Sequence, residues 1–132
     1  MINIESEVFD YVKKGLLEYR DDIYVTGLYY NKPQSFPCVS IEEYQNNIAQ
    51  ETIDSSGEEK FSSVVYDVNV YSNKGNGRKY EAKEIARKAD ELMSSLGFTR
   101  FFTGPTVNYE DTVYRFTMRY SGTVSRDKVI YR

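Results

Sequence analysis

The chain of 132 residues contains no histidine, no tryptophan and a single cysteine, Cys38. Without histidine, the chain lacks the side chain that most often serves as a general base and as a metal ligand. One cysteine excludes an intrachain disulfide, and a lone thiol is typical of a reducing compartment. Because Cys38 follows a proline and opens a predicted strand, a small buried hydrophobic residue is favoured over a nucleophile.

Long apolar runs are also missing, since no run of hydrophobic residues is longer than three. A transmembrane helix needs about 20 such residues, so the sequence predicts no membrane partner. The acidic N-terminus, MINIESEVFD, lacks the charged and apolar regions of a secretion signal. With 40% hydrophobic and 28% charged residues, the chain is predicted to be one soluble globular domain over residues 1–132.

The charge balance and the tyrosine content bear on the kind of partner. A net charge of −3 argues against general binding to duplex DNA, because that binding depends on the neutralisation of phosphates. The 13 tyrosines are compatible with strands and also with protein–protein contacts, because the ring can be buried while the hydroxyl stays hydrated.

Apolar residues at helical spacing predict two helices. The first follows Asn3, which can cap it, and ends near Arg20. Gly15 weakens this helix by up to about 1 kcal/mol relative to alanine. The second covers Ala82–Leu96 and ends at Gly97, a residue type that commonly follows the last turn.

Period-2 alternation and β-branched residues predict a mostly antiparallel sheet of about five strands. The segment Gln45–Lys60 is predicted to be a long polar loop or the splayed tip of a hairpin, and Val124–Arg132 a C-terminal tail. The predicted fold class is therefore α+β, with two helices and about five strands. The predicted strands lie at residues 22–31, 38–44, 61–72, 98–109 and 112–124.

A glycine-rich turn precedes the second helix, in the stretch NKGNGRKY. A Walker-type loop would need a wider glycine spacing and a Lys-Ser or Lys-Thr pair after the second glycine, and a dinucleotide fingerprint would need a third glycine. A turn that leads into the helix is therefore favoured over a nucleotide site. Lys74, Arg78 and Lys79 are instead candidate contacts to an acidic partner, which would offset their unfavourable position at a helix N-terminus.

Titratable groups show no catalytic arrangement. Carboxylate pairs such as Glu42 and Glu43 are predicted to be solvated surface charge, and no metal-loop spacing is present. The sequence predicts no enzymatic activity, no cofactor and no metal.

Arg115 and Arg119 alternate with apolar residues on one predicted strand, as Asp67 and Asn69 do on another. If these two strands are neighbours, ion pairs across them are expected. The alternative is an arginine-lined surface that faces nucleic acid or a partner.

Two stretches, VVYDVNVYSNKGNGRKYEAKEIARKADELMSSLGF and VNYEDTVYRFTMRYSGTV, resemble the tail-terminator, or tail-completion, proteins of long-tailed bacteriophages. The likeness lies in the order of elements: a helix, a hairpin with a long tip, a strand leading to an amphipathic helix, and a closing pair of strands with an aromatic-rich run. It covers nearly the whole chain. It implies a compact α+β subunit that forms a ring, expected to be a hexamer, on the end of the tail tube.

The resemblance also implies partners. They are other copies of the chain, the tail tube protein and the head connector protein, in a virion assembled in the host bacterial cytoplasm. DNA would pass through the ring without specific binding, and no catalysis is implied. The candidate interface residues are Lys74, Arg78 and Lys79, which would meet Glu58 and Glu59 of a neighbour, and the tail tip Val129, Ile130 and Tyr131, which would add to a neighbour's sheet edge.

Other functions stay open at this point. One is a different head–tail connector or minor structural protein. Another is a small ligand-binding or enzymatic domain built from carboxylates, Arg115 and tyrosines, and a third is a nucleic-acid module that uses Lys74, Arg78 and Lys79. A ring predicts a particle several times the monomer mass, which neither of the last two requires.

Overall fold

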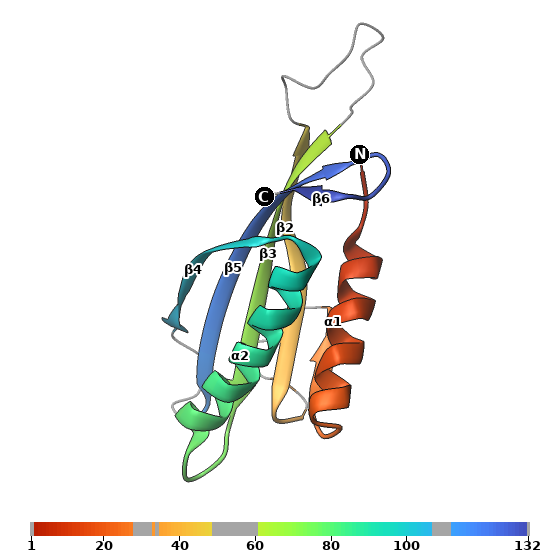
Figure 1. Cartoon of the computed structure of the whole chain (residues 1–132). Helices are drawn as coiled ribbons and strands as arrows, with labels where there is room; N and C mark the ends of the chain where they lie inside the picture. The colour runs from red at the N-terminus through yellow and green to blue at the C-terminus, as the bar shows by residue number, and fades with distance from the viewer. Residues whose placement is uncertain (1, 28–32, 34, 49–60, 107–111, 132) are drawn as a thin grey trace, which may run out of the picture.

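The computed structural model describes residues 2–27, 33, 35–48, 61–106 and 112–131. Helices α1 (Glu5–Tyr19) and α2 (Arg78–Leu96) pack side by side on one face of a six-stranded sheet (Figure 1). This confirms the predicted α+β class with two helices. The strands are β1 (Tyr24–Thr26), β2 (Cys38–Ile48), β3 (Phe61–Ser72), β4 (Thr99–Thr106), β5 (Tyr114–Ser125) and β6 (Ile130–Tyr131).

The sheet has the strand order β1-β2-β3-β5-β4, and β6 pairs with β5 beside β4. Only β1 and β2 run parallel; the other described pairs are antiparallel, as the sequence predicts. Val68 on β3 lies opposite Ile41 on β2 and Met118 on β5, so the three long strands place apolar side chains in register on one face. That face carries the helices.

The core lies between this face and the two helices. Alternate residues of β3 are fully buried there, while Asp67 and Val65 between them are only half-buried, which is the period-2 pattern of a strand with one covered face. The helices contribute residues at spacings of three and four. The buried residues from the three elements are Val64, Tyr66, Val68 and Val70 from β3, Val8, Val12 and Leu16 from α1, and Ile85, Ala89 and Met93 from α2.

The two helices approach closely at Gly15. A Cβ atom at this position would lie 2.5 Å from Cδ2 of Leu92 on α2. One turn earlier on α1, the Tyr11 hydroxyl lies 2.7 Å from that of Ser95. Gly15, which weakens α1 as an isolated helix, therefore makes room for α2.

Two predicted boundaries are corrected by the structure. Helix α2 begins at Arg78, four residues before Ala82, because Gly77 takes a left-handed conformation (φ 87°) that turns the chain into the helix before the apolar spacing begins. The predicted polar loop begins too early, because β2 continues to Ile48. Its polar residues pair with Ser62–Val65 through the backbone, past a bulge between Glu43 and Gln45. The rest of that loop, residues 49–60, lies outside the described residues.

Other predicted segments change as well. Val124 and Ser125 belong to β5, and Ile130–Tyr131 returns as β6, so most of the predicted tail extends the sheet. Strand β4 continues through Gly104-Pro105 without a break, since a residue without an N–H group is tolerated at a sheet edge. Strand β1 occupies only Tyr24–Thr26 of its predicted range. Residues 28–31 and 107–109 of the predicted strands lie outside the described part.

Candidate functional site

Lys74, Arg78 and Lys79, here called the basic turn, lie where β3 leads into α2. Lys74 and Lys79 are exposed and Arg78 is half-buried. None of the three side chains forms an ion pair or hydrogen bond with another described residue. Tyr80 beside them is 71% exposed. Within the described part of the chain, the basic turn is therefore a group of cations without a carboxylate partner, and its role as an interface stays a prediction.

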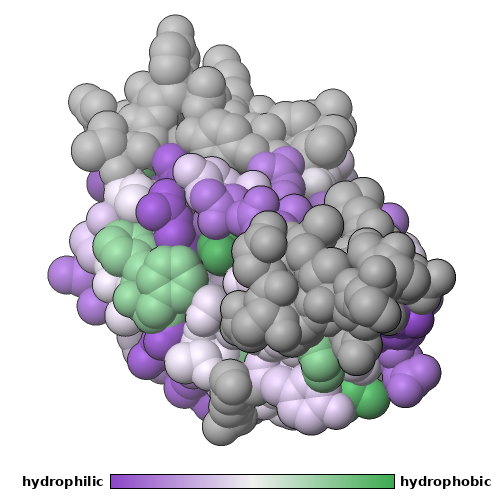
Figure 2. All heavy atoms as spheres, turned by 90° about the horizontal axis from the view of Figure 1, so that it is seen from above, coloured by the Kyte–Doolittle hydropathy of each residue, from purple (hydrophilic) through white to green (hydrophobic). Residues whose placement is uncertain are grey.

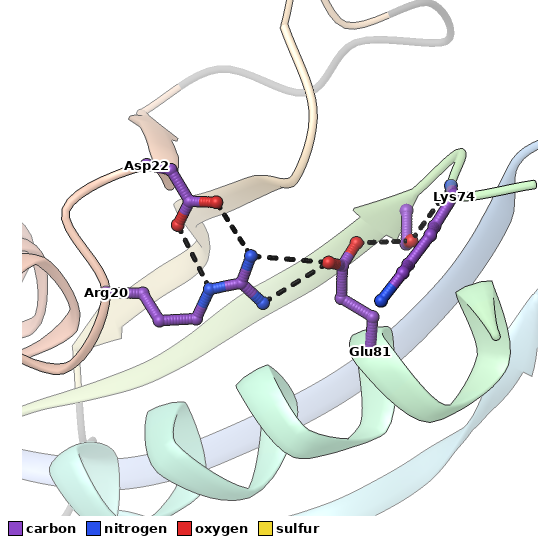
Figure 3. Close-up of polar contacts among 5 residues, drawn as sticks. Arg20, Asp22, Lys74 and Glu81 are labelled. Atoms are coloured by element: carbon purple, nitrogen blue, oxygen red, sulfur yellow. Dashed lines mark hydrogen bonds and ion pairs between the residues drawn. The ribbon is translucent and has the colours of Figure 1, made fainter. Parts of the chain in front are cut away.

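A polar network anchors this turn to the end of α1 (Figure 3). Arg20 donates two hydrogen bonds to Asp22, at 3.0 and 2.7 Å, and two more to Oε2 of Glu81, both at 3.3 Å. The other oxygen of Glu81 accepts a 2.6 Å bond from the Ser72 hydroxyl, which in turn accepts the backbone N–H of Lys74 at 3.3 Å. The network links the ends of α1 and β3 to the first turn of α2.

The network joins one guanidinium to two carboxylates, so it carries a net charge of −1. Hydrogen bonds from Arg20 lower the pKa of Asp22, and the same contact raises the pKa of Arg20. Glu81 also lies in the first turn of α2, where a carboxylate is favoured by the helix dipole. The three cations of the basic turn therefore lie beside a network that carries a net negative charge.

A second surface lies on the face of the sheet that carries no helix. There the guanidinium carbon of Arg119 lies 5.4 Å from the ring centre of Phe102 and 5.7 Å from that of Tyr44. Phe101, next to Phe102 at a bulge in β4, is 57% exposed, and Tyr44 is 58% exposed. We call Tyr44, Phe101, Phe102 and Arg119 the aromatic–arginine patch. Seen from above, apolar side chains lie beside strongly hydrophilic ones on the molecular surface (Figure 2).

Cross-strand pairs hold the arginines of this face in place. Arg119 donates to Asp67 at 3.0 Å, and Arg115 donates to Asn69 at 3.0 Å, which confirms the pairing that the sequence predicts for neighbouring strands. The buried Thr117 hydroxyl also donates to Asn69, at 2.7 Å. Arg119 is thus positioned by Asp67 while its guanidinium lies over two exposed rings, a cation–π arrangement.

The other half of the helix-free face is covered. Cys38 and Tyr71 are fully buried there, and Val113, Tyr24 and Phe36 pack against them. Burial raises the pKa of the Cys38 thiol to about 12. The structure therefore places Cys38 as a packed hydrophobic residue, as the sequence favours, and leaves the aromatic–arginine patch as the open part of the face.

The predicted C-terminal contact residues lie at the end of the sheet that bears β6. Ile130 pairs with Val124 on β5, and Tyr131 stacks edge-on against Phe61 with ring centres 6.0 Å apart. Val129 and Tyr131 remain about half exposed. Strand β6 thus pairs with β5 of its own chain. To pair with a neighbouring subunit, the chain would have to use the outer edge of β6, or β6 would have to detach from β5.

The structure does not bring the predicted interface residues into one site. The basic turn and β6 lie at opposite ends of the molecule (Figure 1). Glu58 and Glu59, the predicted partners of the basic turn, lie outside the described residues. Sequence reasoning missed Tyr44, Phe101 and Phe102. The exposure of the two phenylalanines depends on β4 being an edge strand, and Tyr44 lies at the bulge of β2 between Glu43 and Gln45. The adjacent phenylalanines of TRFFTGPT were the signal for them, since period-2 alternation cannot bury both.

A shallow cavity of about 530 Å³ lies between the start of α1 and β2, with Glu5, Phe9 and Glu43 among its lining residues. Glu43 accepts a 3.0 Å bond from the buried Tyr66 hydroxyl, and a carboxylate oxygen of Glu5 accepts the Glu43 backbone N–H at 2.9 Å. Burial raises the pKa of Glu43. No group of histidine, cysteine or carboxylate side chains within the described ranges could hold a metal ion.

Comparison with known proteins gives no family assignment. No protein-family model matches the chain, and no curated protein sequence matches it. No helix in the described part of the chain is long and apolar enough to cross a membrane. The order of the elements and the exposed surfaces are therefore the features of this chain that bear on its function.

Proposed function

We propose that this protein is a structural subunit of a long-tailed bacteriophage virion. It caps the end of the tail tube as a ring, expected to be a hexamer, and joins the tail to the head connector. The observation that carries this proposal is the aromatic–arginine patch, which is exposed on the face that both helices leave open. Aromatic and arginine side chains are enriched in protein interfaces and contribute most of their binding energy.

The fold supports the same proposal through the order of its elements. Helix α1, the β2–β3 pair, α2 and the β4–β5 pair follow one another in the order of the tail-terminator resemblance. Because both helices lie on one face, the part of the opposite face that holds the aromatic–arginine patch and the β4 edge are left for contacts with other subunits (Figure 1).

A closed ring of identical subunits needs two different surfaces on each subunit, because each contact is head to tail. The chain offers several that differ in chemistry, among them the aromatic–arginine patch and the basic turn. A net charge of −3 is also compatible with a ring through which DNA passes without being retained.

The test is reconstitution on tails that were assembled without this protein. Electron microscopy should show capped tube ends and tails joined to heads when the wild-type chain is added. A variant with Tyr44, Phe101 and Phe102 each replaced by Ala should reduce joining by at least about tenfold, since exposed aromatic anchors dominate interface energies. Tyr19→Ala, which removes an exposed ring from the end of α1, is the matched control and should join normally.

Two results would contradict the proposal. One is that the wild-type chain binds neither tubes nor connectors. The other is a thermal shift of several degrees with nucleotides or divalent metals that disappears when Lys74, Arg78 and Lys79 are reversed to Glu, which would favour a ligand-binding function instead.

A further inference from the structure

The short strand β6 has a small attachment to the rest of the sheet. Its backbone pairs with Thr123 and Val124 of β5. An ion pair between Lys128 and Glu7 ties the preceding turn to α1, but both side chains are about half exposed, and surface pairs of this kind contribute little to stability. The backbone of β6 is thus attached more weakly than that of the long strands.

The place that β6 occupies fits its side chains. Ile130 packs against the core beside two glycines: a Cβ atom at Gly97 would lie 3.1 Å from the Ile130 backbone oxygen, and one at Gly122 would lie 3.3 Å from its Cγ2. Tyr131 stacks edge-on against Phe61. We call Phe61, Gly97 and Gly122, with the pairing edge of β5, the β6 seat. An Ile-Tyr strand fits this seat whichever copy of the chain supplies it.

The turn before β6 holds one residue in an unfavourable conformation. The Lys128 N–H donates to the Ser125 oxygen at 2.9 Å, and the Ser125 N–H donates to the Val129 oxygen at 3.0 Å, which makes a three-residue hairpin loop. The last residue of such a loop is left-handed, and glycine is favoured there. Here it is Lys128, with φ 64°, and no other non-glycine residue in the described part of the chain has a positive φ. The turn is therefore strained.

An exchange of β6 between two copies would keep the contacts of the seat and change the turn. Ile130 and Tyr131 would meet the same groups on a neighbour that they meet here in their own chain. Residues 126–129 are exposed, so water can replace the hydrogen bonds of the turn, whereas the strain at Lys128 is lost when the hinge straightens. Short hinge loops under strain favour this kind of exchange.

We propose that β6 is an exchangeable strand, which leaves its own seat and fills the β6 seat of the neighbouring copy when the ring closes. The inference rests on the ring proposed above and names the contact that fastens it. Each copy gives one strand and receives another, so the contact is head to tail, the type that closes into a ring. Copies held side by side on a tube end have a high effective concentration, so the exchange is favoured there over dilute solution.

The length of the hinge limits where the exchanging ends can lie. From Ser125 to Ile130 the extended chain spans at most about 17 Å. Rotation about the ring axis keeps equivalent points of all copies at one height, and in a six-fold ring adjacent equivalent points are as far apart as each is from the axis. Exchange in a hexamer therefore puts the end of the molecule that carries β6 at the inner rim of the ring.

A reversible disulfide lock tests the exchange. Thr123→Cys with Tyr131→Cys places sulfurs on directly paired residues of β5 and β6, at a spacing that a disulfide can bridge. Oxidised as a dilute monomer, this chain is locked in its own seat and should lose ring formation on tail tubes, and reduction should restore it. Oxidised after assembly, it should give a ladder of disulfide-linked multimers. Thr123→Cys alone is the control and should assemble under both conditions. Cys38 is buried and should not take part.

Substitutions in the hinge test the strain and leave the seat unchanged. Lys128→Gly relieves the left-handed turn and should shift the balance about tenfold toward the closed monomer. Lys128→Pro cannot take a positive φ and should give exchanged multimers at high concentration even without tubes. Glu7→Gln removes the ion pair of Lys128 with the turn intact, so it is the matched control and should assemble as the wild type does. Sedimentation measures the particle mass, and thermal unfolding checks folding.

The outcomes separate the exchange from the proposed function. Rings formed by the locked chain, together with no ladder after assembly, would overturn the exchange and leave the capping function standing. A Lys128→Gly chain that forms rings more readily than the wild type would also overturn the exchange. A wild-type chain that binds neither tubes nor connectors would overturn both.

Discussion

Buried tyrosine hydroxyls account for part of the tyrosine content that first pointed to interfaces. Tyr66 and Tyr120 are fully buried, and each donates to a carboxylate at the rim of the core, Glu43 at 3.0 Å and Asp90 at 2.7 Å. A buried hydroxyl without a partner would cost roughly 1–3 kcal/mol, so these carboxylates have a structural role. These two tyrosines therefore do not indicate a protein interface. Only exposed rings, such as that of Tyr44, can do so.

Glu43 gives a prediction for the dependence of stability on pH. Burial raises its pKa above the ordinary value of 4.5, so the folded state binds this proton more tightly than the unfolded state. This contribution to stability is present at low pH and is lost as the pH rises from the unfolded pKa through the folded one. Glu43→Gln should therefore gain stability relative to wild type between about pH 4 and about pH 7.

The measurement is urea unfolding at both pH values. Glu42→Gln, which removes the adjacent carboxylate, is the control for the loss of one charge. If the difference between Glu43→Gln and wild type were the same at the two pH values, the raised pKa would be refuted.

Cys38 should be almost inert in the folded chain. A pKa raised from 9.0 to about 12 lowers the thiolate fraction roughly a thousandfold near neutral pH, and full burial adds a steric barrier. Reaction with an aromatic disulfide reagent should therefore be at least a thousandfold slower in the native protein than in guanidinium. Comparable rates in the two conditions would mean that the site opens readily or that the thiol is not packed as described.

At the scale of elements, the α1–α2 contact reverses the usual effect of a glycine replacement. Gly15→Ala would gain up to about 1 kcal/mol of helix propensity, but the new methyl group would meet Leu92 at 2.5 Å. Overpacking typically costs about 1–3 kcal/mol, so the net effect should be destabilising by up to about 2 kcal/mol. Denaturant midpoints followed by circular dichroism measure it.

Leu92→Ala provides the matched partner for this test. In the double variant the smaller side chain on α2 makes room for the methyl group added to α1, so the loss of stability should be smaller than the sum of the two single losses by about 0.5 kcal/mol or more. A Gly15→Ala chain that is more stable than wild type would show that the helices do not approach as described.

The elements differ in how well the sequence predicts them, for physical reasons. Strand β3 and helix α2 follow from periodicity, because each buries one face against the core. The extension of β2 over Gln45–Ile48 could not be predicted, since its polar residues join the sheet through backbone pairing and not through an apolar alternation. The first turn of α2 cannot be predicted for a similar reason: the one apolar residue in Arg78–Glu81 is the exposed Tyr80, and the start of the helix is set by the left-handed Gly77.

At the scale of the whole molecule, the sequence reveals the composition of the surfaces but not their location. Lys74, Arg78 and Lys79 are adjacent in the chain, so their grouping could be predicted. Tyr44, Phe102 and Arg119 come from three different strands, and only the strand order and the bulges bring them together.

The C-terminal strand belongs to the fold of the monomer, which gives a prediction about stability. Ile130 packs against the core, and its backbone oxygen lies close to Gly97. Ile130→Ala should lower the free energy of unfolding by about 1–3 kcal/mol, whereas Val129→Ala, at an exposed position beside it, should change it by less than about 0.5 kcal/mol. Equal effects on the isolated chain would show that β6 does not pack as described.

The positions of the two chain ends have a practical consequence for imaging. The start of α1 and strand β6 lie at one pole of the elongated molecule, and the turn that leads into α2 lies at the other (Figure 1). A fluorescent protein or gold-binding tag fused to either end would therefore mark the same pole. If the chain caps a tail as proposed, the height of the tag would show directly whether that pole points to the tube or to the head, and hence which partner the basic turn faces.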